Sequence, residues 1–321
     1  MEFDLYPQKP VLIEEKPKSN VWQTLLSILL FIVAFLFIFS DNISFIFHLV
    51  IVLLIHELGH FSMMKIFNYQ HVRMLFVPLM GAFVQGKKEV YSQRQSLLVV
   101  GLGPFPGILI GAALFYFSLS FHQGWMVDMG ILFLFLNILN LIPIDPLDGG
   151  QLFNLLLHKR QDLFLLIFSF GSSLALISFG FFSEYWLTMI FGFLMAFRVR
   201  SLQKQYLLRK RFKEEGITYE TSYRDLSNED YQRIKTVLLI ENNRIQEYLG
   251  YLNPDEADQF LAQHVNDVLK TPIRKDAGLV FKMILILLWV GLVIAPILFI
   301  TIGDSWINEH FGWYFEYLST K

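Results

Sequence analysis

Two histidines and a glutamate lie close together in an otherwise apolar stretch of the sequence. They form the motif His56-Glu57-Leu58-Gly59-His60, whose two imidazoles are four residues apart. In a helix, residues four apart share a face, so both histidines can reach one metal ion while Glu57 lies beside them to hold a water molecule. The motif predicts metal-assisted hydrolysis, against the alternatives of a chance match or a polar packing patch.

The surroundings of this motif favour the metal-site interpretation. Histidine and glutamate inside a membrane-spanning helix are costly unless they are paired, coordinated or exposed to a water-filled cavity. The chain has no cysteine, so any metal ligands must be histidine, aspartate or glutamate. A catalytic zinc takes three protein ligands and leaves one position for water. A third ligand is therefore expected elsewhere in the chain.

A second motif offers an aspartate for that position. Residues 140–150 read N-L-I-P-I-D-P-L-D-G-G and close a later apolar stretch. The two prolines are expected to break the helix, and Gly149 and Gly150 permit a sharp turn that aims the Asp148 carboxylate at the metal. By helical rise, His56 is expected on the order of 16 Å below the membrane surface. The predicted site therefore lies inside the bilayer.

The composition indicates a protein whose solvent is lipid. Hydrophobic residues make up 54% of the chain and charged residues 17%, with 33 phenylalanines and a mean hydropathy of +0.47. Backbone amides that cross lipid must be paired within a helix. The sequence predicts about seven transmembrane helices, at residues 21–39, 43–67, 95–121, 126–147, 162–182, 185–197 and 278–302.

The distribution of basic residues predicts the orientation. With the N-terminus in the cytoplasm, only Lys321 of the 26 basic residues falls clearly on the other side. We expect a cytoplasmic tail at 1–20, a transmembrane core at 21–200, and an extracytoplasmic tail at 304–321 after a last transmembrane helix at 277–303. The expected location is a prokaryotic cell (inner) membrane. Basic residues follow topology and form no stripe with stacking aromatics, so no nucleic-acid partner is expected.

Two stretches do not resemble transmembrane helices. Residues 72–91 contain glycine and proline between short β-prone runs, which indicates a small β-hairpin or re-entrant segment. Residues 201–276 lose the apolar runs and are predicted to form a cytoplasmic helical module, with helix starts at 227–230 and 253–256. The predicted fold class is an all-α polytopic membrane protein that carries this small membrane-associated β-segment.

The two motifs together resemble the site-2 protease family of intramembrane zinc metalloproteases. HELGH in one span and N-x-x-P-x-x-P-L-D-G-G closing a later span carry the resemblance, which covers residues 43–156. The segment 103–107 resembles the family's glycine- and proline-containing motif, although Phe105 and Pro106 stand where smaller residues are commoner. The resemblance implies five site residues: zinc ligands His56, His60 and Asp148, the catalytic glutamate Glu57, and Asn140 as a polar group near the scissile bond.

The resemblance also implies a function and partners. It implies an intramembrane Zn²⁺ metalloendopeptidase that cleaves transmembrane or membrane-proximal segments of membrane proteins in regulated intramembrane proteolysis, with single-span proteins as partners. Residues 78–86 resemble membrane-associated strands that receive an extended substrate. Two alternatives remain: a catalytically silent scaffold of the same fold, and a divalent metal transporter. A transporter requires a relay of polar sites through the membrane, and the last three predicted spans offer almost none.

Two further features have ordinary structural interpretations. Asn137 lies three residues before Asn140 on one helical face, and a transmembrane asparagine often only bonds a neighbouring helix. Gly103 and Gly107 have the small-xxx-small spacing that permits close helix contact. Neither feature is predicted to belong to the metal site.

Overall fold

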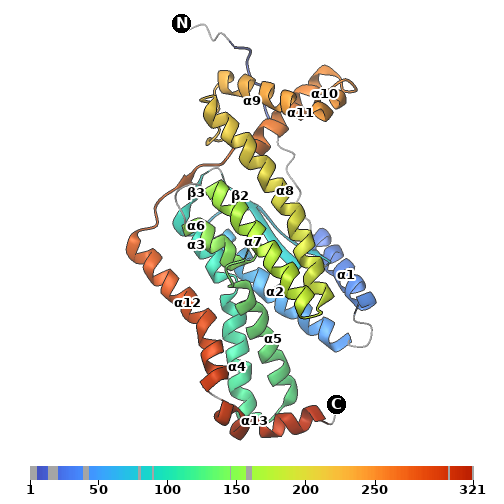
Figure 1. Ribbon diagram of the computed structural model, residues 1–321, viewed down its shortest axis with the longest axis vertical. Coiled ribbons are helices and arrows are strands. Elements are labelled where there is room, and N and C mark those ends of the chain that lie inside the picture. Colours follow the sequence, from blue (N-terminus) through green and yellow to red (C-terminus); the bar gives the residue numbers. More distant parts are fainter. Residues whose placement is uncertain are drawn as a thin grey trace. The chain divides into compact units, whose positions relative to one another are not determined.

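The computed structural model describes residues 6–13, 21–38, 43–78, 81–88, 90–144, 146–156, 161–302 and 304–319. It is mainly helical (Figure 1) and divides into two compact units. The larger unit comprises residues 18–88, 92–195 and 275–321, and the smaller unit comprises residues 1–17, 89–91 and 196–274.

Several helices of the larger unit have the composition of membrane spans. Three are long and apolar enough to cross a bilayer: Ile43–Ile66, Gln93–Phe121 and Asp162–Phe182. Three further apolar helices are shorter: Val21–Phe37, Gly124–Asn140 and Leu279–Ala295. The predicted class of a helical membrane protein is confirmed, whereas the count of seven spans is not confirmed.

The β-hairpin predicted at 72–91 is confirmed. Strands β1 (Gln70–Val77) and β2 (Gly81–Lys87) pair antiparallel, with Leu75 opposite Phe83. Gly81 follows the turn with a φ of 90°, a conformation that favours glycine. An irregularity in register follows Gln70.

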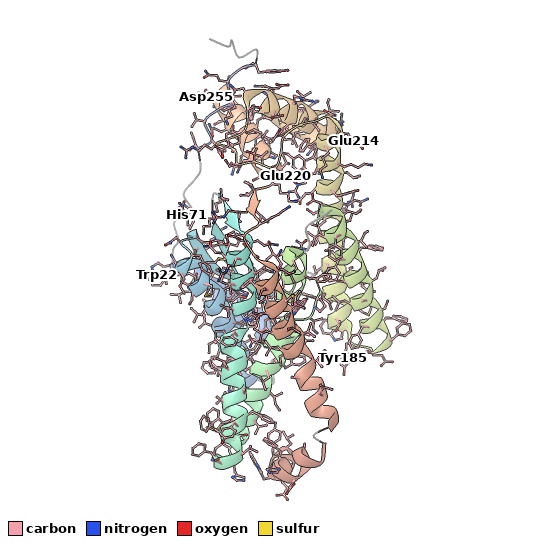
Figure 2. All side chains as sticks on the ribbon, turned by 90° about the vertical axis from the view of Figure 1, so that its left-hand side faces the viewer. Trp22, His71, Tyr185, Glu214, Glu220 and Asp255 are labelled. Carbon is pink, nitrogen blue, oxygen red and sulfur yellow. The ribbon has the colours of Figure 1, made fainter. Side chains whose placement is uncertain are left out.

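Helix α1 (Val21–Ile38) covers the other edge of β1. The Thr24 hydroxyl donates a hydrogen bond to the Met74 carbonyl over 2.8 Å, and the Ser27 hydroxyl accepts one from the Phe76 amide over 3.1 Å. Figure 2 shows Trp22, near the start of α1, close to the strand that carries His71. The edge of β1 opposite β2 is therefore engaged by side chains of α1.

The third predicted span, 95–121, is interrupted. Helix α3 (Gln93–Leu102) ends and α4 (Phe105–Phe121) begins on either side of Gly103 and Pro104. Proline has no amide hydrogen, so Pro104 and Pro106 cannot bond the carbonyls four residues earlier, and a continuous helix would lose two hydrogen bonds here. The break lies against His60 of α2 (Ile43–Ile66).

The helix ending predicted at Leu147 is wrong in detail. Helix α5 (Gly124–Asn140) ends at Asn140, and after a short irregular connection α6 (Asp148–Leu156) begins at Asp148 itself. Gly149 and Gly150 therefore lie inside a helix and not in the expected sharp turn. A Cβ atom at Gly149 would overlap the carbonyls of Leu141 and Ile142, so glycine is needed for this close approach rather than for a turn.

Contacts from two other helices hold α6 and the end of α5 in place. The Trp289 indole of α12 (Leu279–Ile302) donates to the Leu141 carbonyl over 2.6 Å, and the Gln93 amide of α3 donates to the Leu155 carbonyl over 2.7 Å. Buried Leu97 and Leu152 pack in the same apolar cluster. These contacts thus fix the position of the helix start that carries Asp148.

The sixth predicted span, 185–197, is the beginning of a longer helix. Helix α8 (Trp186–Glu214) continues past Phe197 because the following residues include neither glycine nor proline and are mostly good helix formers. It stops before Gly216, whose φ of 67° is typical of a helix C-terminus. The remaining helices of the larger unit are α7 (Gln161–Phe182) and α13 (Asp304–Ser319).

The smaller unit contains α9 (Asn228–Glu241), α10 (Asn243–Leu249) and α11 (Pro254–Val268). Both predicted helix starts are confirmed: the Ser227 side chain caps α9, and Asn253 forms a capping box with Glu256 on α11. Helix α10 was not predicted. The strand pair β3 (Tyr91–Ser92) and β4 (Ile273–Arg274) is very short.

Candidate metal centre

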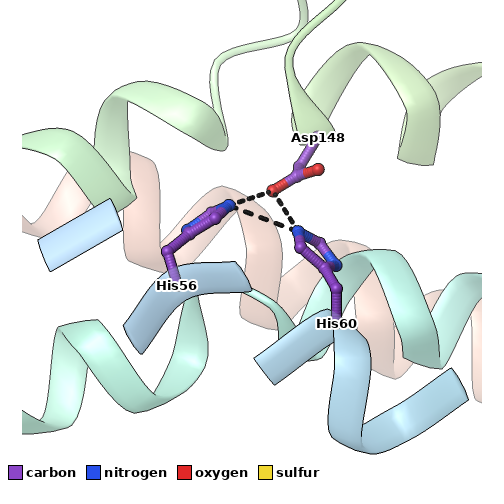
Figure 3. Close-up of side chains that lie close together, drawn as sticks. All are labelled: His56, His60 and Asp148. Carbon is purple, nitrogen blue, oxygen red and sulfur yellow. Dashed lines mark hydrogen bonds and ion pairs between the residues drawn. The ribbon is translucent and has the colours of Figure 1, made fainter. Parts of the chain in front are cut away.

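Three buried side chains from two helices converge on one point (Figure 3). His56 and His60 extend from one face of α2, and Asp148 extends toward them from the start of α6. The Oδ2 atom of Asp148 lies 3.1 Å from the Nε2 atom of His56 and 3.2 Å from that of His60, and the two Nε2 atoms are 3.2 Å apart. The structure therefore brings together the three residues that the sequence proposed as ligands.

Val99 fixes the orientation of His60. The Nδ1 atom of His60 lies 2.9 Å from the backbone carbonyl oxygen of Val99 in α3. A carbonyl oxygen can only accept, so Nδ1 must carry the hydrogen and donate it. In the neutral imidazole, the Nε2 atom that faces Asp148 then presents its lone pair.

Asn137 fixes His56 in the same way. The Asn137 amide nitrogen donates to the Phe133 carbonyl over 2.8 Å, which leaves its Oδ1 atom 2.9 Å from the Nδ1 atom of His56. Because this oxygen accepts, His56 also carries its hydrogen on Nδ1 and directs the Nε2 lone pair into the cluster. Such outer partners orient metal-binding histidines in many proteins.

The donor set fits a cation, and its spacing fits zinc. Two imidazole lone pairs and a carboxylate oxygen facing one another at 3.1–3.2 Å repel unless a positive charge lies between them. Ligand atoms about 2.05 Å from a tetrahedral ion lie about 3.3 Å apart, which is close to all three distances. Three protein ligands also leave one position of a tetrahedral site for water.

Glu57 is available for a role beside the cluster. It is 4% exposed and lies on α2 directly after His56. Within the described parts of the chain, its Oε2 atom is buried and has no hydrogen-bond partner. A buried carboxylate oxygen without a partner is costly, and such groups are commonly explained by a catalytic function or by a water molecule or ion that binds there.

Glycines at three positions make room for His60, for Asn137 and for the close approach of α2 to the Gly103 backbone. A Cβ atom at Gly103 would overlap the His60 ring, and one at Gly107 would overlap the Asn137 amide. One at Gly59 would approach the Gly103 carbonyl oxygen to 2.5 Å. The break between α3 and α4 is thus the surface against which the HELGH helix packs.

Asn140 is not bonded to the metal cluster in the way that Asn137 is. It is the last residue of α5 and is half-buried. Among the residues whose placement is described, it has no hydrogen bond to His56, His60 or Asp148. Its proposed role near a scissile bond stays a prediction.

Four contributors were not assigned to the site from the sequence: Asn137, Gly103, Gly107 and the Val99 carbonyl. Asn137 bonds a neighbouring helix, as expected from the sequence, but its partner there is His56. Gly103 and Gly107 do permit close contact, and what they contact is the His60 ring and the Asn137 amide. The four-residue spacing of these glycines could have indicated a close contact at the site. The role of the Val99 carbonyl could not be predicted, because every residue has a backbone carbonyl.

Comparisons with known proteins agree with the chemistry of this cluster. No family model matches the chain. A zinc metalloprotease of Methanocaldococcus jannaschii is 24% identical over 208 residues, which are 62% of this chain and 57% of that protein. Stage IV sporulation protein FB of Bacillus subtilis is 29% identical over 138 residues, which are 41% of this chain and 46% of that protein. The chain spans about half the length of the curated relatives it matches.

A solved structure is also similar. The site-2 protease from Methanocaldococcus jannaschii is 21% identical, with a TM-score of 0.45, over 55% of this chain and 87% of that chain. The two curated relatives confirm the resemblance to the site-2 protease family that the two motifs carry.

Proposed function

We propose that this chain, which resembles the site-2 protease family, is a zinc metalloendopeptidase that cleaves membrane proteins within or at the edge of the bilayer. The observation that carries the proposal is the cluster of His56, His60 and Asp148, with three mutual distances of 3.1–3.2 Å. The similarity to a zinc metalloprotease supports it. So do the long apolar helices.

His56, His60 and Asp148 would hold the zinc ion. When bound, zinc supplies a Lewis acid that lowers the pKa of a water molecule toward neutrality and polarises a peptide carbonyl. The donated hydrogen bonds from His56 to Asn137 and from His60 to Val99 keep both rings turned so that Nε2 faces the ion.

Glu57 would act as the general base and then as the general acid. Its unpartnered buried carboxylate oxygen accepts a proton from the attacking water molecule. The same carboxyl group then gives that proton to the leaving amide nitrogen, so no net proton is consumed at Glu57. Asn140 is proposed to donate its amide hydrogen to the carbonyl oxygen as negative charge develops there.

The substrates are proposed to be single-span membrane proteins. A helical substrate must unwind locally before its carbonyls can be attacked, and a sheet edge can hold the extended form by main-chain hydrogen bonds. Thr24 and Ser27 of α1 engage the outer edge of β1. We therefore assign the receiving edge to β2, which overlaps the predicted segment 78–86 and extends one residue beyond it.

The proposed location is a prokaryotic cell membrane with the N-terminus in the cytoplasm. The asymmetry of lysine and arginine supports this orientation. A reporter enzyme that works only outside the cytoplasm should be active when it is fused after Ser319. A reporter that works only inside the cytoplasm should be inactive there, and the opposite pattern would reverse the assigned orientation.

Activity and metal content test the proposal together. Purified protein and the Glu57→Gln variant should both contain about one zinc ion per chain, whereas cleavage of a tagged single-span protein should fall by about 10²–10⁴-fold in the variant because the general base is lost. Equal cleavage by both would exclude the role of Glu57. Identical accumulation of membrane proteins in cells that carry either form would favour a scaffold.

Zinc flux separates proteolysis from transport. Proteoliposomes that contain the protein should show no zinc uptake above that of empty liposomes. Uptake that disappears in a His56→Ala/His60→Ala variant, but persists in Glu57→Gln, would replace the protease proposal with a transporter.

A further inference from the structure

The smaller unit binds an extended stretch of its own chain. Residues 6–13, which precede the first helix, have no helical or strand structure and lie against α9, α11 and the loop before α9. The contacting residues are more than 210 positions apart in sequence. The contact lies entirely within one compact unit and does not involve the metal centre.

Most of the hydrogen bonds to this stretch involve its main-chain amide and carbonyl groups. The Tyr223 hydroxyl donates to the Pro10 carbonyl over 2.8 Å, and the Asn228 side chain accepts from the Lys9 amide over 3.0 Å. Gln259 makes two bonds: its amide nitrogen donates to the Val11 carbonyl over 2.8 Å, and its oxygen accepts from the Ile13 amide over 3.1 Å. Side chains that bond main-chain groups in this way recognise an extended peptide whatever its side chains are.

Two side chains of the stretch are recognised as well. The Lys9 ammonium donates to three backbone carbonyls, those of Tyr223 at 2.7 Å, Arg224 at 2.9 Å and Leu226 at 2.5 Å. It also lies 5.3 Å from the centre of the Tyr223 ring, within the range of a cation–π contact. The carbonyls of this turn thus form a cation-binding site that accepts a lysine.

Leu12 supplies the apolar anchor. It packs against the buried core of the smaller unit. The core residues are Phe212, Ile217, Tyr219, Tyr223, Leu226, Tyr231, Ile234, Val237, Leu238, Ala262, Val265 and Leu269. By contrast, Val11 is 83% exposed and Ile13 is 68% exposed, so their side chains face solvent.

We infer that the groove formed by α9, α11 and the 222–227 loop is a peptide-docking site, occupied in the resting protein by residues 6–13 of the same chain. Its ligand is an extended peptide that carries a lysine three residues before a leucine. A segment of another polypeptide with this pattern competes with the chain's own residues. On this inference, residues 6–13 are an exchangeable occupant of a recognition site and not a fixed part of the fold.

The competition follows from the linkage. A segment tethered to its site acts at a high effective concentration. A free peptide of equal intrinsic affinity therefore finds the groove mostly occupied by residues 6–13. The apparent affinity falls in proportion to the fraction of groove that is open. Removal of residues 2–13 opens the groove completely.

The test uses the full chain in detergent and a variant that lacks residues 2–13. The probe is a fluorescein-labelled peptide with the sequence of residues 6–13, and binding is followed by fluorescence polarisation. The truncated protein should bind the probe at least about tenfold more tightly than the full chain, because its groove is open. Equal binding to both forms, or no binding to a truncated protein that melts like the full chain, would overturn the inference.

Matched peptides test the pattern. Lys9→Ala and Leu12→Ala peptides should each bind about tenfold more weakly or worse, since each loses an anchor, while the Val11→Ala peptide should bind within about twofold of the parent. Equal affinity for the Lys9→Ala and Val11→Ala peptides would exclude the lysine site. If the truncated protein is unstable, the full-length Lys9→Ala/Leu12→Ala variant opens the same groove without shortening the chain.

Discussion

The Oδ1 atom of Asn137 in α5 accepts a hydrogen bond over 2.9 Å from the Nδ1–H group of His56 in α2. The bond is buried, and the Asn137 side chain is wholly inaccessible to solvent. It joins a helix that carries the HELGH motif to one that carries none of the three clustered residues. It therefore gives a test of how the imidazole is oriented.

Replacement of Asn137 by leucine should weaken zinc binding without removing a ligand. Leucine has the same branching and number of side-chain heavy atoms but cannot accept the Nδ1 hydrogen, and loss of such an outer partner costs about 10–100-fold in metal affinity. Competition with a chromogenic chelator measures the change. The Asn137→Asp variant keeps an acceptor oxygen and should stay nearer to wild type than the leucine variant, so equal loss in both variants would show that the acceptor oxygen is not what zinc binding requires.

Replacement of Gly103 by alanine should disturb His60. The added methyl group would overlap the imidazole ring, whose Nδ1 atom is held by the Val99 carbonyl one helical turn before Gly103. We expect a loss of zinc affinity of about tenfold or more, comparable with the loss of an outer partner. Zinc content after dialysis measures it.

Gly101→Ala is the matched control for that change. A Cβ atom at Gly101 would make ordinary contacts of 3.6 Å with Leu285 and 3.8 Å with Leu152. Alanine is the better helix former by about 1 kcal/mol. This variant should keep its zinc and be as stable as wild type or slightly more so; zinc loss in it would mean that any added bulk in α3 disturbs the site.

Gly107 and Asn137 should behave as one unit in a double-mutant cycle. A methyl group at Gly107 would occupy the position of the Asn137 amide, so Gly107→Ala alone should weaken zinc binding in the way that Asn137→Ala does. In the Asn137→Ala background the methyl group has space and should add little further loss. Zinc affinities that are simply additive would show that the two residues act independently, since coupling is expected only for residues that interact.

The sequence predicted the cluster better than it predicted the elements that carry it. HELGH fixes two histidines on one helical face wherever that helix lies, so His56 and His60 depend on local geometry alone. The approach of Asp148 was inferred correctly, although the reason was not: the glycines beside it are inside α6, where Gly149 permits contact with the Leu141 carbonyl. The same sequence suits a sharp turn and a close helix approach, and only tertiary packing selects between them.

Features that depend on backbone groups could not be predicted. The Val99 carbonyl that orients His60 lies in the last turn of α3, so its position depends on where the helix breaks. The extension of α8 through Phe197 to Glu214 was missed for another reason. A change from apolar to charged residues marks a change of solvent and does not by itself end a helix.

The hydroxyl group of Ser27 should protect one amide of the edge strand. It accepts from the Phe76 amide, and Ser27→Ala removes that acceptor while leaving α1 apolar. The Phe76 amide should then exchange with solvent deuterium about 5- to 10-fold faster, which corresponds to the roughly 1 kcal/mol net contribution of one hydrogen bond. Exchange resolved to single amides by mass spectrometry measures this change.

The neighbouring amide of Leu75 is the internal control for that experiment. Alternation in an antiparallel ladder directs Leu75 toward β2, opposite Phe83, so its exchange should not change. Faster exchange at both amides would mean that the whole hairpin opens. Because substrate is assigned to β2, Ser27→Ala should also leave cleavage unchanged. A marked rise in cleavage would instead mean that α1 competes with substrate for the edge of β1.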